Sequence, residues 1–130
     1  DYKGAIADFT KAIEIDPNDA SAYYNRGLAK YYLKDYYGAI ADCTKAIEIN
    51  PNNAYAYYNR GLAKYDLKDY KGAISDYTKV IGINPNDADA YYNRGLSKYY
   101  LGYVNGACKD ARKAQELGYY ASAFIEATCN

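Results

Sequence analysis

The sequence predicts an all-α fold, a solenoid built from helix-turn-helix repeats with a period of 34 residues. Three observations support this prediction. A block of sequence recurs along the chain with little change, and each block holds two runs of apolar residues at helical spacing. Blocks also close on an Asn-Pro or Asp-Pro step, which stops a helix from continuing into the next unit.

The period is visible when the sequence is aligned with itself. The segment that begins at Ala20 recurs from Ala54 and again from Ala88. The matching positions are Gly27, Gly61 and Gly95; Pro17, Pro51 and Pro85; Ala5, Ala39, Ala73 and Ala107; Asp8, Asp42, Asp76 and Asp110. We therefore expect a single array over 1–130, divided into a lone second helix of a preceding unit (1–19), repeats at 20–53, 54–87 and 88–120, and a terminal capping helix or tail (121–130).

Each unit contains the signals that begin and end two helices. In the first full unit we expect helices at 20–33 and 36–49, joined by a short Lys-Asp connection. Residues that can cap a helix N-terminus precede the helices. They are Asp19, Asn53 and Asp87 before the first helices, and Asp1, Asp35 and Asp69 before the second helices.

The two ends of the chain depart from the regular unit. The sequence has no Met and begins inside a repeat, so we expect it to be a segment of a longer array. The unit at 88–120 has lost its Pro and one loop residue, as expected of a degenerate terminal repeat. We expect Asn130 to lie near the natural C-terminus.

These residues resemble the pattern of the tetratricopeptide repeat family over essentially the whole chain. The family places an aromatic residue and a Gly in the first helix, and Ala and an aromatic residue in the second. The matching residues are Tyr23, Tyr57 and Tyr91; Gly27, Gly61 and Gly95; Phe9 and Tyr77, with Cys43 and Ala111 substituting; Ala12, Ala46 and Ala114, with Val80 substituting. The resemblance implies a right-handed superhelix whose first helices line the concave side.

One stripe on the first helices is rich in Tyr and Leu and would line that concave side. We call it the predicted groove. It consists of Tyr24, Asn25, Leu28, Tyr31, Tyr32, Tyr55, Tyr58, Asn59, Leu62, Tyr65, Tyr92, Asn93, Leu96, Tyr99 and Tyr100. Tyr buries a large rigid ring and keeps a polar tip, and the Asn amides could bind the main chain of a peptide. The alternative is that single tyrosines only pack adjacent first helices together.

A more specific function of the family is not expected here. Some members grip the C-terminal carboxylate of heat-shock chaperones with Lys, Arg and Asn. The matching places in this chain carry Tyr24, Leu28, Asn59, Asp89 and Asn93. Because Asp89 has the wrong sign, we predict that the chain is not a carboxylate-clamp co-chaperone.

A second stripe on the first helices is basic where the family is usually apolar. It consists of Arg26, Lys30 and Lys34; Arg60, Lys64 and Lys68; Arg94 and Lys98. It could bind an acidic partner. We favour ion pairs with Asp8, Asp42 and Asp76 of the second helices, because 16 basic residues balance 16 acidic residues in the chain.

Glycines and cysteines recur within the second helices. Gly4, Gly38, Gly72 and Gly106 suggest a close approach, either of a neighbouring helix, which we favour, or of a ligand. Cys43 and Cys108 are expected to be small core residues and Cys129 an exposed thiol. Three cysteines without a CxxC pair weakly favour free thiols and the cytoplasm, and the compartment is otherwise open.

Composition excludes several classes of function. The net charge of zero gives no bulk attraction to nucleic acid, and no apolar run is long enough for a membrane span. The absence of His removes the usual general base and His-ligated metals or haem. We expect no enzymatic activity and no cofactor.

The sequence therefore predicts a non-catalytic scaffold that binds a peptide or protein segment in the predicted groove. The alternative is a self-associating structural module. The leading helix lacks a first helix of its own unit, so a second copy of the chain could cover its apolar face. That self-association face consists of Tyr2, Ile6, Phe9 and Ile13.

Overall fold

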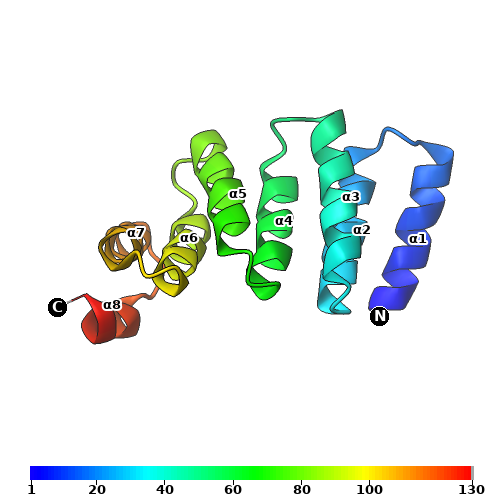
Figure 1. Cartoon of the computed structure of the whole chain (residues 1–130). Helices are drawn as coiled ribbons and strands as arrows, with labels where there is room; N and C mark the ends of the chain where they lie inside the picture. The colour runs from blue at the N-terminus through cyan, green and yellow to red at the C-terminus, as the bar shows by residue number, and fades with distance from the viewer. Residues whose placement is uncertain (130) are drawn as a thin grey trace.

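The computed structural model describes residues 1–129, which form eight α-helices and no strand. The helices are α1 (Tyr2–Ile15), α2 (Ala20–Tyr32), α3 (Tyr36–Ile49), α4 (Ala54–Asp66), α5 (Tyr70–Ile83), α6 (Ala88–Tyr100), α7 (Val104–Glu116) and α8 (Ser122–Thr128). They follow one another across the molecule, so that the two termini lie at opposite ends of the array (Figure 1). Asn130, which we expected near the natural C-terminus, lies outside the described residues.

The helices begin where the capping residues predict. Asp1, Asp19, Asp35, Asn53, Asp69 and Asp87 each accept a hydrogen bond from a backbone N–H in the first turn of the next helix. Helix α7 differs, because Tyr103 precedes it and makes no such bond. We call α2, α4 and α6 the A helices, and α1, α3, α5 and α7 the B helices.

The turn from each A helix to its B helix uses a residue in the left-handed region. Lys34 and Lys68 have φ of 64° and 63°, and Gly102 stands at the matching position with φ of 83°. Glycine adopts this conformation without the steric penalty of a side chain. The degenerate third unit therefore has the most relaxed turn of the three.

The core is built from small residues at the period of the repeat. Ala39, Ala73 and Ala107 are at most 1% exposed, and Gly27, Gly61 and Gly95 are also buried. A Cβ placed on Gly61 would lie 2.9 Å from Cε1 of Tyr77, and one on Gly95 would lie 3.1 Å from the carbonyl oxygen of Ala107. These glycines therefore allow the A and B helices of a unit to approach closely.

The glycines near the start of the B helices meet a neighbouring helix, as we favoured, at only two of the four positions, Gly72 and Gly106. A Cβ on Gly38 or Gly72 would collide with the carboxylate of Asp35 or Asp69, which caps the same helix. Their close neighbours are therefore the helix cap and, at Gly72, the side chain of Lys64 from the A helix of the same unit. A Cβ on Gly106 would lie 3.2 Å from Cδ of Lys98 on α6, again the A helix of the same unit, whereas at Gly4 and Gly38 only the capping Asp is close.

The cysteine prediction was wrong for two of the three residues. Cys108 of α7 and Cys129 form a disulfide with Cα atoms 5.6 Å apart, whereas Cys43 is free and fully buried. The disulfide forms because α8 folds back beside α7, a contact between the tail and the array that the repeat pattern does not encode. The argument for the cytoplasm from free thiols loses its basis.

Candidate functional site

Side chains of the predicted groove connect neighbouring A helices. Tyr24 of α2 stacks on Tyr55 of α4 with ring centroids 5.6 Å apart, and Tyr65 of α4 meets Tyr100 of α6 edge to face. Helices α2 and α4 also pack directly on each other, while no ring contact or hydrogen bond joins consecutive B helices within residues 1–129. The A helices thus form one continuous surface along the array.

Two of the three asparagines in this surface are already engaged. Asn59 is 7% exposed and donates a hydrogen bond from Nδ2 to the carbonyl oxygen of Tyr24 at 3.3 Å. Asn93 donates from Nδ2 to the hydroxyl of Tyr58 at 2.9 Å. These amides therefore hold units together, and their donors are less available to a peptide than the sequence suggested.

Several groove tyrosines lie at the ends of the A helices and contact the B helices. Tyr32 stacks on Tyr2, and Tyr100 stacks on Tyr70, with ring centroids 5.0 and 5.2 Å apart. At the place equivalent to Tyr32 and Tyr100, α4 carries Asp66 instead. These stacks match the alternative in which a tyrosine packs helices together.

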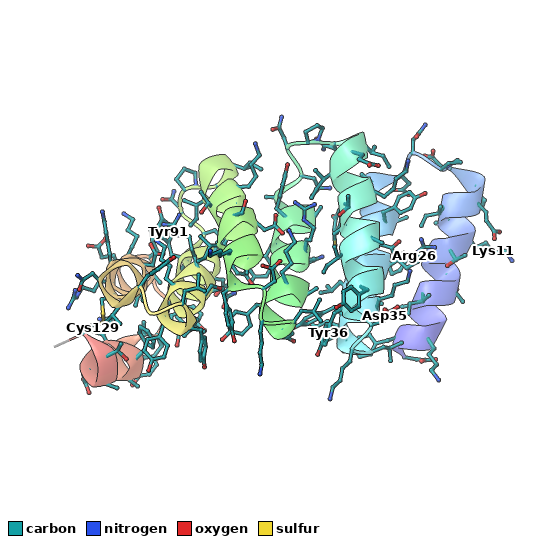
Figure 2. The ribbon with its side chains drawn as sticks, viewed as in Figure 1. Lys11, Arg26, Asp35, Tyr36, Tyr91 and Cys129 are labelled. Carbon is teal, nitrogen blue, oxygen red and sulfur yellow. A yellow bond between two sulfur atoms is a disulfide. The ribbon has the colours of Figure 1, made fainter. Side chains whose placement is uncertain are left out.

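The B-helix tyrosines of this edge were missed as candidate site residues, with the exception of Tyr2. The available signal was the spacing, since Tyr2, Tyr36 and Tyr70 recur at the first position of successive B helices. Figure 2 labels Tyr36 and Asp35 at the turn end of α3.

Burial raises the pKa of several tyrosine hydroxyls in this surface. The pKa of Tyr58 is raised to about 12, mainly by burial and then by the negative charges of Asp89 and Asp87. Burial and a hydrogen bond to Asp66 raise the pKa of Tyr31 as well, and burial and the neighbouring Tyr100 raise that of Tyr65. Like any phenol with a pKa of 10 or more, these hydroxyls are neutral at physiological pH, and that of Tyr31 is already bonded to Asp66.

A hollow opens in this surface between α4 and α6. Its volume is about 440 Å³. Its lining residues are Ala54, Tyr55, Tyr58, Asn59, Val80, Asn84, Asp87 and Asp89. Three of these belong to the predicted groove, and the two carboxylates lie at the start of α6, where Asp87 is the capping residue and Asp89 is in the first turn.

The far end of the surface is covered by the C-terminal segment. Tyr119 stacks on Tyr92 at 4.3 Å between ring centroids, and Phe124 of α8 contacts the rings of Tyr92 and Tyr99. The disulfide of α7 with Cys129 and a hydrogen bond from Arg112 to the carbonyl oxygen of Cys129 hold this segment in place. We expected a terminal capping helix or a tail at 121–130; α8 lies there, and its contact with the rings of α6 was not foreseen.

Six of the eight residues of the basic stripe pair with carboxylates of the B helices, as favoured, whereas Lys34 and Lys68 lie exposed at the turns. Arg26 donates two hydrogen bonds to Asp42 at 2.8 Å, and Lys30 pairs with the same carboxylate at 3.0 Å. The arrangement repeats as Arg60 and Lys64 with Asp76, and Arg94 and Lys98 with Asp110. A basic surface for an acidic partner is therefore not presented by these residues.

The geometry corrects the predicted pairing in one respect. Each arginine pairs with the B helix of its own unit and also reaches the preceding B helix, where Arg26 donates to the hydroxyl of Thr10. Asp8 lies on α1, which has no A helix of its own unit in the structure, and its side chain is exposed. Figure 2 shows Arg26 between α1 and the rest of the array.

Two kinds of feature are absent from residues 1–129. No group of three or more Cys, Asp or Glu side chains is placed to hold a metal ion. None of the described helices has the length and apolar character needed to cross a membrane.

These features define a helical repeat solenoid with an aromatic surface on its A helices. The tetratricopeptide repeat family model matches residues 20–53 and 54–87, and a related TPR repeat model matches residues 1–34. The chain belongs to the tetratricopeptide repeat (TPR) family, and its fold is the expected right-handed superhelical solenoid.

Solved structures of the same family are similar to the chain. A crystal structure of MamA is 28% identical with a TM-score of 0.87 and covers 98% of this chain and 72% of that one. MamA of Desulfovibrio magneticus RS-1, from residue 41 to its end, is 27% identical with a TM-score of 0.85 and covers 90% of this chain and 66% of that one.

A third similar structure holds a peptide. The first TPR of Spaghetti (RPAP3), bound to the HSP90 peptide SRMEEVD, is 26% identical with a TM-score of 0.82 and covers 87% of this chain and 92% of that one. No curated protein sequence matches the chain significantly.

Proposed function

We propose that the chain is a non-catalytic scaffold that binds a peptide or protein segment along the predicted groove. The observation that carries this proposal is an aromatic surface that runs across the A helices and contains a hollow of about 440 Å³. A hollow of this size lies within the range of roughly 300 to 1,000 Å³ that is typical of ligand sites. TPR structures with a bound peptide, such as that of RPAP3, support the same use of the fold.

The exposed tyrosines of the groove have the chemistry that such binding requires. Tyr55 and Tyr100 are 69% and 56% exposed, although each ring is held by a neighbouring tyrosine. A ring that is already fixed loses little conformational entropy when a partner covers it. The groove would therefore bind through preformed aromatic anchors.

The ligand is not expected to be an acidic C-terminal segment of the kind that RPAP3 binds. Of the places that match a carboxylate clamp, Asn59 and Asn93 each use one of their two amide N–H donors within the array, on the carbonyl oxygen of Tyr24 and the hydroxyl of Tyr58. Asp89 adds a negative charge beside them. We expect the peptide SRMEEVD to bind at least about tenfold more weakly than the best ligand of the groove.

Binding can be tested with a fluorescent peptide library and a matched pair of variants. Tyr55→Ala removes an exposed ring of the groove, and Tyr37→Ala removes a ring of similar exposure on α3. We expect the dissociation constant to rise about tenfold or more for Tyr55→Ala and to stay unchanged for Tyr37→Ala. Equal effects of the two substitutions would rule out the groove.

Self-association is a second candidate function, and it is favoured by the exposure of α1 at positions that are buried in the other B helices. Ala39, Asp42 and Ala46 of α3 are buried, whereas the matching Ala5, Asp8 and Ala12 of α1 are not. Tyr2 of the self-association face stacks on Tyr32, while Ile6, Phe9 and Ile13 are half-buried. A helix of a second copy would cover the positions that an A helix covers in the other units.

Sedimentation equilibrium over a hundredfold range of concentration separates the two candidates. If self-association occurs through α1, the wild type forms oligomers, and Phe9→Glu remains a folded monomer. A wild type that stays monomeric over the whole range would exclude this candidate and leave peptide binding.

A further inference from the structure

We propose that the hollow between α4 and α6 binds the side chain of a basic residue, Lys or Arg, in the segment that occupies the groove. This inference rests on the proposed function and adds the chemical class of the ligand. We call the hollow the basic-residue pocket; its lining is that given above for the hollow of about 440 Å³.

The walls and rim of the pocket are complementary to a cation. Tyr55 and Tyr58 provide aromatic rings, and Asp87 and Asp89 provide two carboxylates, while no Lys or Arg lines the hollow. An ammonium or guanidinium group is attracted to the face of an aromatic ring, and a charge-assisted hydrogen bond to a carboxylate is stronger than a neutral one. An acidic or apolar side chain would leave these carboxylates without a new partner.

The carboxylates of Asp87 and Asp89 differ in whether the protein already binds them. Asp87 caps α6 by accepting a hydrogen bond from the backbone N–H of Ala90 at 3.1 Å, so its position is fixed by the helix. Asp89 follows in the first turn of α6 and is exposed. No hydrogen bond or ion pair of Asp89 occurs within residues 1–129, so its carboxylate is available to a ligand.

The pocket lies at a place where the repeat changes. The residues matching Asp89 in the two preceding units are Ser21 and Tyr55. At the preceding junction, the ring of Tyr55 stacks on Tyr24. At the next junction, Asp89 replaces that ring, so Tyr58 has no stacking partner from residue 89 and the space beside it lies open.

The electrostatics of the pocket agree with this geometry. Beyond burial, the charges of Asp89 and Asp87 are the largest causes that raise the pKa of Tyr58, so the fields of both carboxylates reach the aromatic wall. All basic residues of the A helices pair with Asp42, Asp76 or Asp110 or lie at the turns, away from the lining. Within the lining, therefore, the two carboxylates have no basic side chain as a partner.

The probe for the test is a fluorescein-labelled decapeptide library in which one position is fixed and the others are mixtures. Pools with Arg, citrulline or Glu at the fixed position are compared, because citrulline keeps the shape of Arg and removes its charge. We expect the best Arg pool to bind the wild type about tenfold more tightly than the matched citrulline pool, and the preference to decrease with salt.

Three variants assign the preference to the pocket. Asp89→Asn should reduce it to about threefold or less, and Asp89→Tyr, which restores the ring of the preceding unit, should abolish it. Glu14→Gln removes one negative charge from an exposed site on α1 and should leave the preference unchanged. Asp89 makes no contact that the fold requires, so we expect these variants to stay folded, which circular dichroism can verify.

The outcomes distinguish this inference from the proposed function. Equal binding of the Arg and citrulline pools, or a preference that survives Asp89→Asn, would overturn the basic-residue pocket; the groove would still stand if Tyr55→Ala weakens every pool. If no pool binds the wild type, both the pocket and the groove fail.

Discussion

Two glycines of the middle unit lie in opposite environments, which makes them a sensitive test of the packing at single positions. A Cβ on Gly61 would lie 2.9 Å from the ring of Tyr77, which is 1% exposed. A Cβ on Gly82 of α5 would have no neighbour within 4 Å. The same substitution should therefore have opposite effects at the two sites.

We predict that Gly61→Ala lowers the free energy of unfolding by about 1 to 3 kcal/mol, because a buried ring must move to admit the methyl group. Gly82→Ala should raise it by about 0.5 to 1 kcal/mol, because Ala has the higher helix propensity at an open position. Urea denaturation measures both values. A destabilised Gly82→Ala would contradict the open environment of that site.

The stability of the array should depend on pH because burial raises the pKa of tyrosines such as Tyr58. Since burial raises the pKa of Tyr58 from its ordinary value of 10.0 to about 12, the folded state holds that proton more tightly than the unfolded state. The stabilising contribution is complete below about pH 10 and is lost as the pH rises from 10 to 12. We expect Tyr58→Phe to reduce the loss of stability over this range, relative to wild type, in urea titrations at successive pH values. Tyr37→Phe, at an exposed ring, is the control and should behave as wild type.

The thiol of Cys43 should be unreactive in the folded chain. It is fully buried, and burial together with the charge of Asp42 raises its pKa to about 12. A thiol reagent attacks the thiolate, so labelling at pH 8 should require unfolding of the array. The measurement is the rate of labelling with and without urea, and equal rates in both conditions would contradict the buried position.

At the scale of helices, the Asp that recurs on the B helices is buried and paired in the three full units and exposed on α1. Asp76 is 2% exposed and pairs with both Arg60 and Lys64, whereas Asp8 stands at the matching position of α1 and is exposed. Removing one partner of a buried pair leaves the other charges uncompensated. Replacing the Asp should therefore lower the free energy of unfolding at position 76 and leave it nearly unchanged at position 8.

We predict that Asp76→Ala lowers the free energy of unfolding by about 3 to 5 kcal/mol. Asp8→Ala should change it by less than about 0.5 kcal/mol in the monomer. Thermal and urea unfolding at low protein concentration give both values. A large effect of Asp8→Ala at high concentration only would show that a second copy covers α1.

The disulfide should control whether α8 stays against the array. Cys108 and Cys129 are 21 residues apart in sequence, and closing a loop of this length contributes about 3 kcal/mol through the unfolded state. We expect Cys129→Ser to increase the rate of hydrogen exchange in residues 119–129 while α2 to α5 keep their protection. Unchanged exchange in this segment would mean that Tyr119 and Phe124 hold α8 without the disulfide.

At the scale of the whole molecule, the array should behave as a sum of similar units. Units 20–53 and 54–87 use the same arginine, aspartate and threonine contacts to their neighbours. A second copy of 54–87 inserted after residue 87 would form these contacts on both sides. We predict a higher urea midpoint and a larger m-value than wild type. A Gly/Ser insert of equal length should lower the midpoint.

The features that the sequence predicted are those that depend on neighbouring residues and recur with the period. Asp1 and Asp19 cap their helices because a carboxylate placed before an apolar run can reach the N–H groups of the first turn. All fifteen residues of the predicted groove lie on the A helices, as the spacing required.

The features that the sequence did not predict depend on contacts between distant segments. The choice of Asp42 and not Asp8 as the partner of Arg26 depends on which B helix faces each arginine. The disulfide and the rings of Tyr119 and Phe124 depend on how the last residues fold back, beyond the range of the period.

Because the C-terminal segment covers Tyr92 and Tyr99, a segment bound along the groove would be blocked at the α6 end and open at the α2 end. A ligand lying along the A helices could extend past α2, but it would meet Phe124 and Tyr119 at the other end. The end of the ligand would then rest against Tyr119 and Phe124, and this contact would fix where its other residues lie along the groove. Partners would be selected by how far their recognised side chains stand from a chain end or a bend.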